Sequence, residues 1–361
     1  MSAPETRAPA TRAFRLPSLR PGARGRILSG MRPTGKLHLG NWVGALQNWV
    51  ALQGEYENFH MVADWHALTT GTEHVDEIVS NTYEMVLDWL AAGIDPKISP
   101  MFVQSHVKEH AELHLLFSML ISKARLERNP TLKDQVRDLG MEESSISYGH
   151  LGYACLQAAD ILLYRAGIVP VGEDQVPHIE ITREIARRFN HLFCPEDDPV
   201  FPEPEPRLTQ FPRLRGLDGS RMSKSVGNTI LLADSPEEIF AKVRSAYTDP
   251  TKIRKTDPGH PEGCVVFEYH RFLNAGEAPS IGELCRAGKL GCVDDKHHLA
   301  QIMADRLAPI RERRAELART PDLVWDVLHD GAKRVRVEAK ATMERVRAAM
   351  KLVDPKGGGN S

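Results

Sequence analysis

Residues 26–46, "RILSGMRPTGKLHLGNWVGAL", run from a short apolar segment through a glycine-containing turn into a regular apolar pattern. The apolar segment at residues 26–31 is typical of a buried strand, and the apolar spacing after Leu39 is typical of an amphipathic helix. A strand, a turn and a helix in this order form the first half of a βαβ unit. The stretch therefore predicts a parallel sheet that begins with residues 26–31.

The alternation of strand and helix continues beyond this first unit and predicts an α/β fold with a parallel sheet. Residues 195–217 are rich in proline and are predicted as a loop, and the chain after Asp234 is predicted to be mainly helical. Further strands are expected within residues 58–68 (where a loop follows the strand), 98–107 and 168–175. Helices are expected at residues 39–53, 75–95, 153–167 and 177–193, and a polar helical segment at about 108–150.

The composition is that of a soluble globular protein. Of the 361 residues, 42% are hydrophobic and 26% are charged, and no apolar run is long enough to cross a membrane. We therefore expect a cytoplasmic protein without a membrane partner. The formal net charge is −2, so nucleic-acid binding would depend on local basic patches. The five cysteines are scattered, which favours reduced thiols or a metal site over a disulfide framework.

The two ends of the chain differ from the rest. Residues 1–25 are rich in Pro, Ala and Arg, with Glu5 as the only acidic residue. This composition is shared by organelle transit peptides and by disordered basic tails. Four prolines interrupt any amphipathic helix, which favours the disordered tail. Residues 354–361 are predicted to be a flexible C-terminus.

The turn at residues 33–41 has the features of a phosphate-binding site. It follows the first strand of a parallel sheet, where ligands bind next to the N-termini of helices. Gly35 and Gly40 allow the backbone to approach a ligand closely, and His38 can donate a hydrogen bond to a phosphate oxygen. The pattern matches neither a P-loop nor a dinucleotide fingerprint, so a plain connection between strand and helix is the alternative.

A second polar segment has complementary chemistry. Residues 216–228, "GLDGSRMSKSVGN", place Arg221 and Lys224 among small residues. A mobile cationic loop of this kind can close over a polyphosphate as charge develops during a reaction. The alternative is a solvated basic loop without a ligand.

The pair "HLGN" at residues 38–41 and "RMSKS" at residues 221–225 resembles the two signature sequences of the class I aminoacyl-tRNA synthetases. Within that class, the segments "SGMRPTGKLHLGNWVGAL", "LQAADILLY" and "VPVGEDQVPHIEITREIARRFN" resemble tryptophanyl-tRNA synthetases. The resemblance implies a homodimer that joins ATP and L-tryptophan into tryptophanyl-adenylate. It then implies transfer of tryptophan to the 3′ end of tRNA(Trp), with release of AMP and diphosphate.

The resemblance also divides the chain. It implies a Rossmann-like catalytic domain at residues 26–230, with the helical insertion at about 108–150 and the RMSKS loop at 221–225. Residues 231–353 correspond to the helical anticodon-binding domain. The resemblance implies that Arg311, Arg313, Arg314 or Arg336 lies near RNA and that the segment at 108–150 forms the dimer contact.

Adenylation requires positioning and charge neutralisation, because the attacking carboxylate is already charged and needs no protein base. Helix N-termini, cationic side chains, His38 and Mg²⁺ suit this task, and we assign Lys224, His38 and Arg221 as catalytic residues. Arg221 stands where the family usually has lysine, and Arg32 stands where many members have glutamine. The residues expected to bind ATP are Arg32, Pro33, Thr34, Gly40, Asn41, Gly172, Glu173, Asp174, Arg221, Met222, Ser223, Lys224 and Ser225.

One predicted helix carries the side chains expected to select the amino acid. Tyr153, Gln157 and Asp160 are spaced so that they share one helix face. The indole N–H is a donor without an acceptor, and the Asp160 carboxylate can accept it. Gln175 is expected to bind the amino acid as well. Alternatively, Asp160 and Gln157 satisfy neighbouring backbone groups.

Two other functions share these features. A tyrosyl-tRNA synthetase has a closely similar fold, and a Gln and Asp pair could also bind a phenol. A non-catalytic paralogue could bind RNA or protein, although the complete set of phosphate-binding residues argues against it.

Three cysteines in the C-terminal region have the spacing of a metal site. Cys264, Cys285 and Cys292 are followed by Asp295, with 20, six and two residues between successive members. A subset of tryptophanyl-tRNA synthetases has a similar pattern with a fourth cysteine, which binds a [4Fe–4S] cluster. Asp295 could serve as the fourth ligand. A zinc site completed by His297 or His298, and three buried thiols without metal, are the alternatives.

Overall fold

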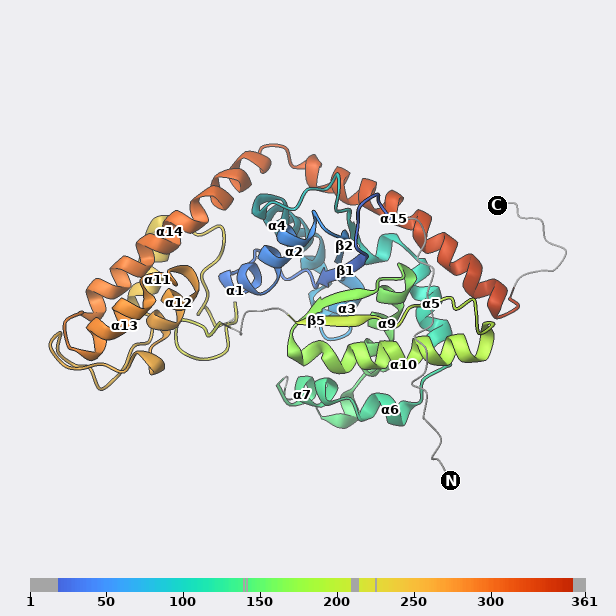
Figure 1. Ribbon diagram of the computed structural model, residues 1–361, viewed down its shortest axis with the longest axis horizontal. Coiled ribbons are helices and arrows are strands. Elements are labelled where there is room, and N and C mark those ends of the chain that lie inside the picture. The colour runs from blue at the N-terminus through green and yellow to red at the C-terminus, as the bar shows by residue number, and fades with distance from the viewer. Residues whose placement is uncertain (1–18, 139, 141, 209–213, 225, 353–361) are drawn as a thin grey trace, which may run out of the picture.

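The computed structural model describes residues 19–138, 140, 142–208, 214–224 and 226–352 (Figure 1). Within these residues the chain forms a five-stranded sheet in the order β3-β2-β1-β4-β5, and all neighbouring strands run parallel. The predicted α/β class is confirmed. The strands are β1 (Arg26–Met31), β2 (Glu57–Val62), β3 (Met101–Val103), β4 (Ile168–Val171) and β5 (Glu205–Leu208).

The helices of the N-terminal part connect these strands as the sequence predicts. These helices are α1 (Leu39–Asn41), which runs through a π-helical turn (Trp42–Leu46) into α2 (Gln47–Leu52), then α4 (Ile78–Ala92), α9 (Tyr153–Leu163) and α10 (Val176–Phe193). Helix α4 is ended by Gly93 in the left-handed conformation, with φ 109°, which glycine adopts without strain. The predicted helical segment at 108–150 contains α5 (Glu109–Ser118), α6 (Lys123–Glu127), α7 (Pro130–Asp138) and α8 (Tyr148–Leu151).

Two local predictions are wrong. The region predicted as a proline-rich loop contains β5, and the region predicted as a loop after β2 contains the short helix α3 (Asp64–Leu68). Strand β5 has the sequence "EPRL" and pairs with β4 alone, at the edge of the sheet. An edge strand tolerates proline and needs no apolar face, so its sequence lacks the usual strand pattern.

The C-terminal region is helical as predicted, and its two long helices run across the top of the view in Figure 1. Its long helices α14 (Cys292–Leu317) and α15 (Asp322–Ala349) follow the smaller α11 (Pro236–Arg244), α12 (Val265–Leu273) and α13 (Ala278–Arg286). Helix α15 packs along the edge strand β3 and also contacts α4, α5 and α9. At Gly331 the two backbones are so close that an added Cβ would collide with the carbonyl oxygen of Met101. The domain boundary at residue 230 remains a prediction.

The described residues form two large apolar clusters. One contains Leu39 and Trp89 together with Leu307 of α14, so α4 and the C-terminal helices share a core with the turn at residues 33–41, which the sequence predicts to bind phosphate and which is called the phosphate-site turn below. The other contains Phe102 and Phe189 and is continuous with α15. In the part of the chain that is described, no helix combines the length and the apolar character that crossing a membrane requires.

Candidate active site

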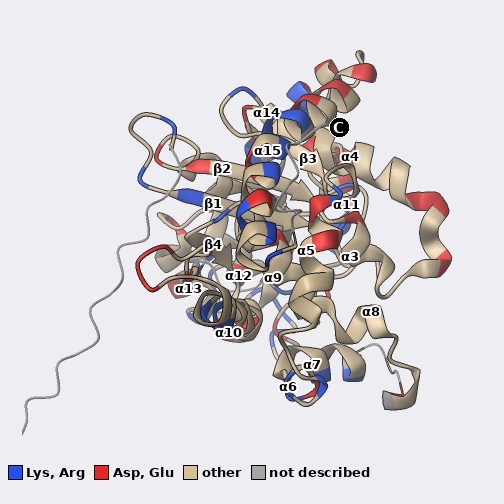
Figure 2. Cartoon of the chain, turned by 90° about the vertical axis from the view of Figure 1, so that its right-hand side faces the viewer, with Lys and Arg blue, Asp and Glu red and all other residues tan. Residues whose placement is uncertain are grey.

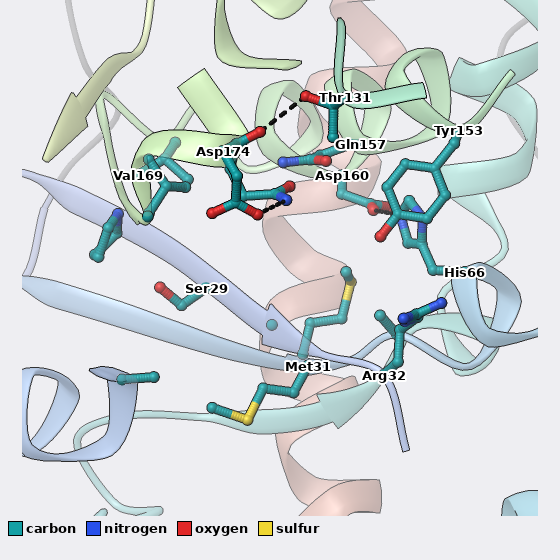
Figure 3. A pocket seen from close by; sticks show the side chains of 18 of the residues that line it. Ser29, Met31, Arg32, His66, Thr131, Tyr153, Gln157, Asp160, Val169 and Asp174 are labelled. Carbon is teal, nitrogen blue, oxygen red and sulfur yellow. Dashed lines mark hydrogen bonds and ion pairs between the residues drawn. The ribbon is translucent and has the colours of Figure 1, made fainter. Parts of the chain in front are cut away.

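A cavity of about 820 Å³ opens at the carboxyl ends of β1 and β4. The order of the strands reverses between these two neighbours, because β2 and β3 lie on one side and β5 on the other. In open parallel sheets, ligands bind at this point of reversal. The cavity is lined by Ser29, Gly30 and Met31 at the end of β1 and by Val169, Pro170 and Val171 of β4 (Figure 3).

Many of the residues predicted from the sequence meet in this cavity. Of the other described members, Glu173 lies in the turn after β4, the rest, including Lys224 and His38, belong to the two loops beside the cavity, and Ser225 lies outside the described residues. The predicted residues that line the cavity are Arg32, Asn41, Tyr153, Gln157, Asp160, Gly172, Asp174, Gln175 and Arg221.

Asp160 lies on α9 at one end of the cavity and is almost completely buried. Its Oδ1 accepts hydrogen bonds from Gln104 Nε2 and His110 Nδ1, both at 2.7 Å. Its Oδ2 lies 2.7 Å from His66 Nε2, which donates when the proton is on that nitrogen. A carboxylate oxygen has two lone pairs, so Oδ2 retains an acceptor position beside this bond. Figure 3 shows Asp160, His66 and Tyr153 converging on the cavity.

The surroundings keep Asp160 ionised. Burial alone raises the pKa of this carboxyl, but the interactions with His66 and His110 outweigh the burial and hold the pKa below its ordinary value. His110 Nε2 lies 2.7 Å from the Tyr164 hydroxyl, which donates to it and thereby fixes the proton on Nδ1 facing Asp160. Tyr164 is fully buried and acts on Asp160 through His110, whose orientation it fixes.

Aromatic rings and an amide form the adjoining wall. The ring of Tyr153 lies 4.3 Å from the ring of His66 and 5.5 Å from the ring of His178. Gln157 Oε1 lies 2.9 Å from His178 Nδ1. Burial, with a smaller effect of His66, lowers the pKa of His178 to about 4. His178 is therefore neutral near pH 7 and can donate its Nδ1–H to Gln157.

The phosphate-site turn presents His38 in a defined tautomer. The Asn41 backbone N–H donates to His38 Nδ1 at 3.3 Å, and the His38 backbone N–H donates to Asn41 Oδ1 at 3.1 Å. Because Nδ1 accepts, the proton of the neutral ring is on Nε2. Burial first, and then the charge of Lys224, lower the pKa of His38 to about 4. His38 is thus a neutral hydrogen-bond donor at physiological pH.

The two signature segments lie side by side. Lys224 Nζ donates to the Thr34 carbonyl oxygen at 2.5 Å and contacts Thr34 Oγ1 at 3.3 Å. The Leu39 N–H donates to the Ile230 carbonyl oxygen at 2.8 Å, which joins the backbone of the first turn to the chain that follows the second loop. A Cβ at Gly40 would lie 2.9 Å from Met222 Sδ, so the absence of a side chain permits this approach. Segments separated by about 190 residues in sequence thus form one surface.

The turn after β4 completes the cavity. Gly172 precedes a short 3-10 helix (Glu173–Gln175), in which Gln175 Nε2 donates to Asp174 Oδ2 at 2.9 Å. The Thr131 hydroxyl of α7 donates to the Asp174 carbonyl oxygen at 2.8 Å, so the polar helical segment also reaches the site. Across the cavity, Arg32 Nη1 donates to Thr70 Oγ1 at 3.1 Å.

Sequence reasoning missed the three side chains that hold Asp160. His66 lies on α3, which follows β2, Gln104 follows β3 directly, and His110 is the second residue of α5. The carboxyl-end rule that located the phosphate turn also applies to these strands, because parallel strands end at the same edge of the sheet. The position of Gln104 directly after the strand at 101–103 was therefore a usable signal, whereas His66 and His110 lie farther along the chain on helices.

The predicted metal ligands do not form a site that fits a metal. Over the described ranges, no group of three or more His, Cys, Asp or Glu side chains could hold a metal ion. Cys264, Cys285 and Cys292 are free thiols. Asp295 Oδ1, the predicted fourth ligand, lies 3.1 Å from His270 Nε2 instead. For the zinc alternative, His297 packs against Phe240 and His298 pairs with Glu277.

The four arginines expected near RNA all contact the protein. Arg311, Arg313 and Arg336 donate to backbone carbonyl oxygens of Asp234, Ala91 and His106. Arg314 pairs with Asp88 and Glu84, and 13% of its side chain is exposed. This burial argues against the RNA contact predicted for Arg314. Basic and acidic side chains are interspersed in the sequences of α14 and α15, and Figure 2 shows both kinds on these helices.

Comparison with known proteins agrees with this geometry. Curated relatives include the tryptophan–tRNA ligase of Thermotoga maritima, 52% identical over 331 residues that cover 91% of this chain and 99% of the relative. The tryptophan–tRNA ligase of Aquifex aeolicus is 43% identical and is covered completely by 91% of this chain. The crystal structure of tryptophanyl-tRNA synthetase from Campylobacter jejuni, complexed with ADP and tryptophan, superposes with a TM-score of 0.79 at 32% identity, over 90% of this chain and 99% of that one. Residues 21–308 match the family described as tRNA synthetases class I (W and Y). The chain therefore belongs to the class I tRNA synthetases of the W and Y family.

Proposed function

We propose that this protein is a tryptophan–tRNA ligase, which activates L-tryptophan with ATP and transfers it to the 3′ end of tRNA(Trp). The observation that carries the proposal is the cavity in which an ionised Asp160, on one side, faces the two joined phosphate-site loops on the other. The names of the relatives support tryptophan as the substrate. Charging tRNA would take place where translation occurs, in the cytoplasm.

The first step joins the amino acid to AMP. An oxygen of the tryptophan carboxylate attacks the α-phosphorus of ATP, the bond to the bridging oxygen breaks, and diphosphate leaves. In the second step, a ribose hydroxyl at the 3′ end of the tRNA attacks the carbonyl carbon of the adenylate, and AMP leaves. Neither step needs a covalent enzyme intermediate, so the protein contributes orientation and stabilisation of charge.

The charge that develops on the diphosphate is stabilised by donors from both loops. His38 Nε2 donates to a phosphate oxygen, and the Lys224 ammonium neutralises the leaving group. Arg221 lines the cavity and supplies a further cationic donor. The bound nucleotide carries Mg²⁺, which neutralises phosphate charge in the same way. Arg32, which also lines the cavity, has a fork of donors for the carboxylate or the α-phosphate.

Selection of the side chain takes place at α9. The acceptor position on Asp160 Oδ2 receives the indole N–H, while the rings of Tyr153 and His66 form an aromatic wall. Gln157 and Gln175 also line the cavity, and in this proposal they bind the amino group and the carboxylate of the substrate. ATP lies between the turn at Gly172 and the phosphate-site turn.

The proposal includes a homodimer and tRNA as partners. Exposed apolar side chains on the segment predicted as the dimer contact support self-association, namely Leu115, Met119 and Tyr148. An iron–sulfur cluster is not part of the proposal, because the residues predicted as its ligands do not fit one.

ATP–diphosphate exchange tests the proposal without tRNA. Labelled diphosphate should enter ATP when tryptophan is present and not when any other amino acid replaces it. The variant Arg244→Met, which changes an exposed residue on α11, is the control for protein quality. Exchange that depends on tyrosine would support a tyrosyl enzyme instead, and a complete lack of exchange would support a non-catalytic protein.

A further inference from the structure

A buried carboxylate lies directly behind the phosphate-site turn. Asp88 is on α4, and its side chain is completely shielded from solvent. Its Oδ2 accepts the backbone N–H of Leu37 at 2.6 Å. Leu37 is the residue before His38, so this hydrogen bond fixes the backbone at the start of the phosphate-binding helix.

The other oxygen of Asp88 is held by the C-terminal helices. Arg314 Nε, on α14, donates to Asp88 Oδ1 at 2.6 Å, and a second nitrogen of the same guanidinium pairs with Glu84. Arg314 is near the end of α14, more than 220 residues after Asp88 in sequence. The carboxylate thus bridges a cation on α14 and a backbone donor in the active-site turn.

Both partners have little freedom to rearrange. The Asp88 side chain is 0% exposed and the Arg314 side chain 13% exposed, so water cannot readily replace a lost partner. Removing Arg314 would leave the buried Asp88 carboxylate without its cationic partner, which is strongly unfavourable. The hydrogen bond between Asp88 and the Leu37 N–H therefore depends on the presence of Arg314. On its other side, the same turn is held by Lys224 through the Thr34 carbonyl oxygen.

We propose that Arg314 and Asp88 are positioning residues for the phosphate-site turn, and that through them the C-terminal helices hold the adenylation site in its productive geometry. This inference rests on the proposed function. Neither residue lines the substrate cavity, so their effect on the reaction is indirect. Any shift of α14 relative to α4, such as one caused by a bound RNA, would be transmitted to His38 through the Leu37 hydrogen bond.

The expected consequence is selective for ATP. If the turn moves by about 1 Å, the donors to the diphosphate are misplaced, and a displacement of that size lowers a rate by about 100-fold. The indole-binding side chains are on α9 and are held by His66, Gln104 and His110, none of which contacts Asp88 or Arg314. Tryptophan binding should therefore change little.

The test compares Arg314→Met, Asp88→Asn and the double variant with the wild-type chain. In ATP–diphosphate exchange, each single variant should lower kcat by about 10- to 100-fold and raise the KM for ATP, while the KM for tryptophan stays within about twofold. The double variant should have a kcat no lower than that of the less active single variant, because the two residues act through one contact. Hydrogen exchange at the Leu37 amide should be faster in all three.

Arg347→Met is the matched control. Arg347 lies on α15 and forms a two-bond ion pair with Glu112 on α5, which also joins a C-terminal helix to the N-terminal part but does not touch the turn. Its loss should leave the exchange kinetics and the Leu37 amide unchanged.

Two results would overturn the inference. One is unchanged kcat and KM for ATP in Arg314→Met; the other is an equal loss for ATP and tryptophan with faster hydrogen exchange throughout the chain. If the wild-type chain lacks exchange activity with every amino acid, the proposed function fails. In that case protection of the Leu37 amide still decides whether the pair positions the turn.

Discussion

Replacing Asp160 by asparagine tests how the cavity would recognise an indole ring. Oδ1 of Asp160 receives two donors, from Gln104 and His110, so the amide oxygen of Asp160→Asn should take that position. The amide nitrogen then occupies the position of Oδ2, next to His66. His66 can move its proton to the other ring nitrogen, which has no partner among the described residues, and accept from the new amide. The fold should therefore tolerate this change.

The indole N–H would then face a donor instead of a carboxylate. A hydrogen bond to a charged group contributes about 1.5–3 kcal/mol. Because 1.4 kcal/mol corresponds to a factor of ten, the loss should raise the KM for tryptophan by about 10- to 150-fold. The ATP-binding loops do not contact Asp160, so the KM for ATP should change by less than about twofold.

An analogue without the N–H makes the assignment specific. In 3-(benzothiophen-3-yl)alanine a sulfur replaces the indole nitrogen, and the ring keeps nearly the same shape. In diphosphate exchange, the wild-type chain should prefer tryptophan over the analogue by about 10- to 150-fold, for the same energetic reason. The preference should nearly disappear in Asp160→Asn. The reasoning is refuted if the variant keeps the wild-type preference, or if Asp160→Ala leaves the KM for tryptophan unchanged.

Three further predictions follow from the electrostatics of the site and the core. Lys224→Met should lower kcat for adenylate formation by about 100- to 1,000-fold, as expected for a donor to developing charge, with tryptophan binding unchanged. Single-turnover kinetics measure this loss, and a clearly smaller loss would contradict the prediction. Burial lowers the pKa of His60 to about 3, and burial with a smaller effect of His66 lowers that of His178 to about 4. The unfolded chain therefore binds more protons between about pH 6.5 and pH 4, and the free energy of unfolding should fall with falling pH by up to about 1.4 kcal/mol per pH unit for each histidine. Equal melting temperatures at pH 7 and pH 5 would contradict this, and His60→Phe should reduce the slope. Because the described residues contain no group of three or more His, Cys, Asp or Glu side chains that could hold a metal ion, anaerobically purified protein should lack a stoichiometric cluster, and near-equal amounts of iron and sulfide would show the opposite.

The position of the turn that we propose binds phosphate, beside the cavity, was predictable because the relevant pattern is local. The turn that contains Gly35 and His38 follows a strand and opens a helix, and these features alone indicate an anion site. Asp160 was predictable for a related reason, since a carboxylate in an apolar helix needs a partner. Strand β5 was not, because an exposed edge strand with Pro206 has no apolar alternation.

Other parts of the site depend on contacts between distant segments. The donors that hold Asp160 lie on α3, in the turn after β3 and on α5, 50 to 94 residues earlier in the chain, and no local pattern pairs them with Asp160. The contact between Arg314 and Asp88 spans 226 residues. Arg314 also shows how the sequence misleads, because a basic residue on a long helix resembles an RNA contact until its buried partner is known.

The most direct test of the central claim is aminoacylation of purified tRNA. The wild-type chain, supplied with ATP and Mg²⁺, should attach labelled tryptophan to tRNA(Trp) to near completion and leave tRNA(Tyr) uncharged. Transfer of tyrosine to tRNA(Tyr), or diphosphate exchange without any charging of tRNA(Trp), would contradict the account.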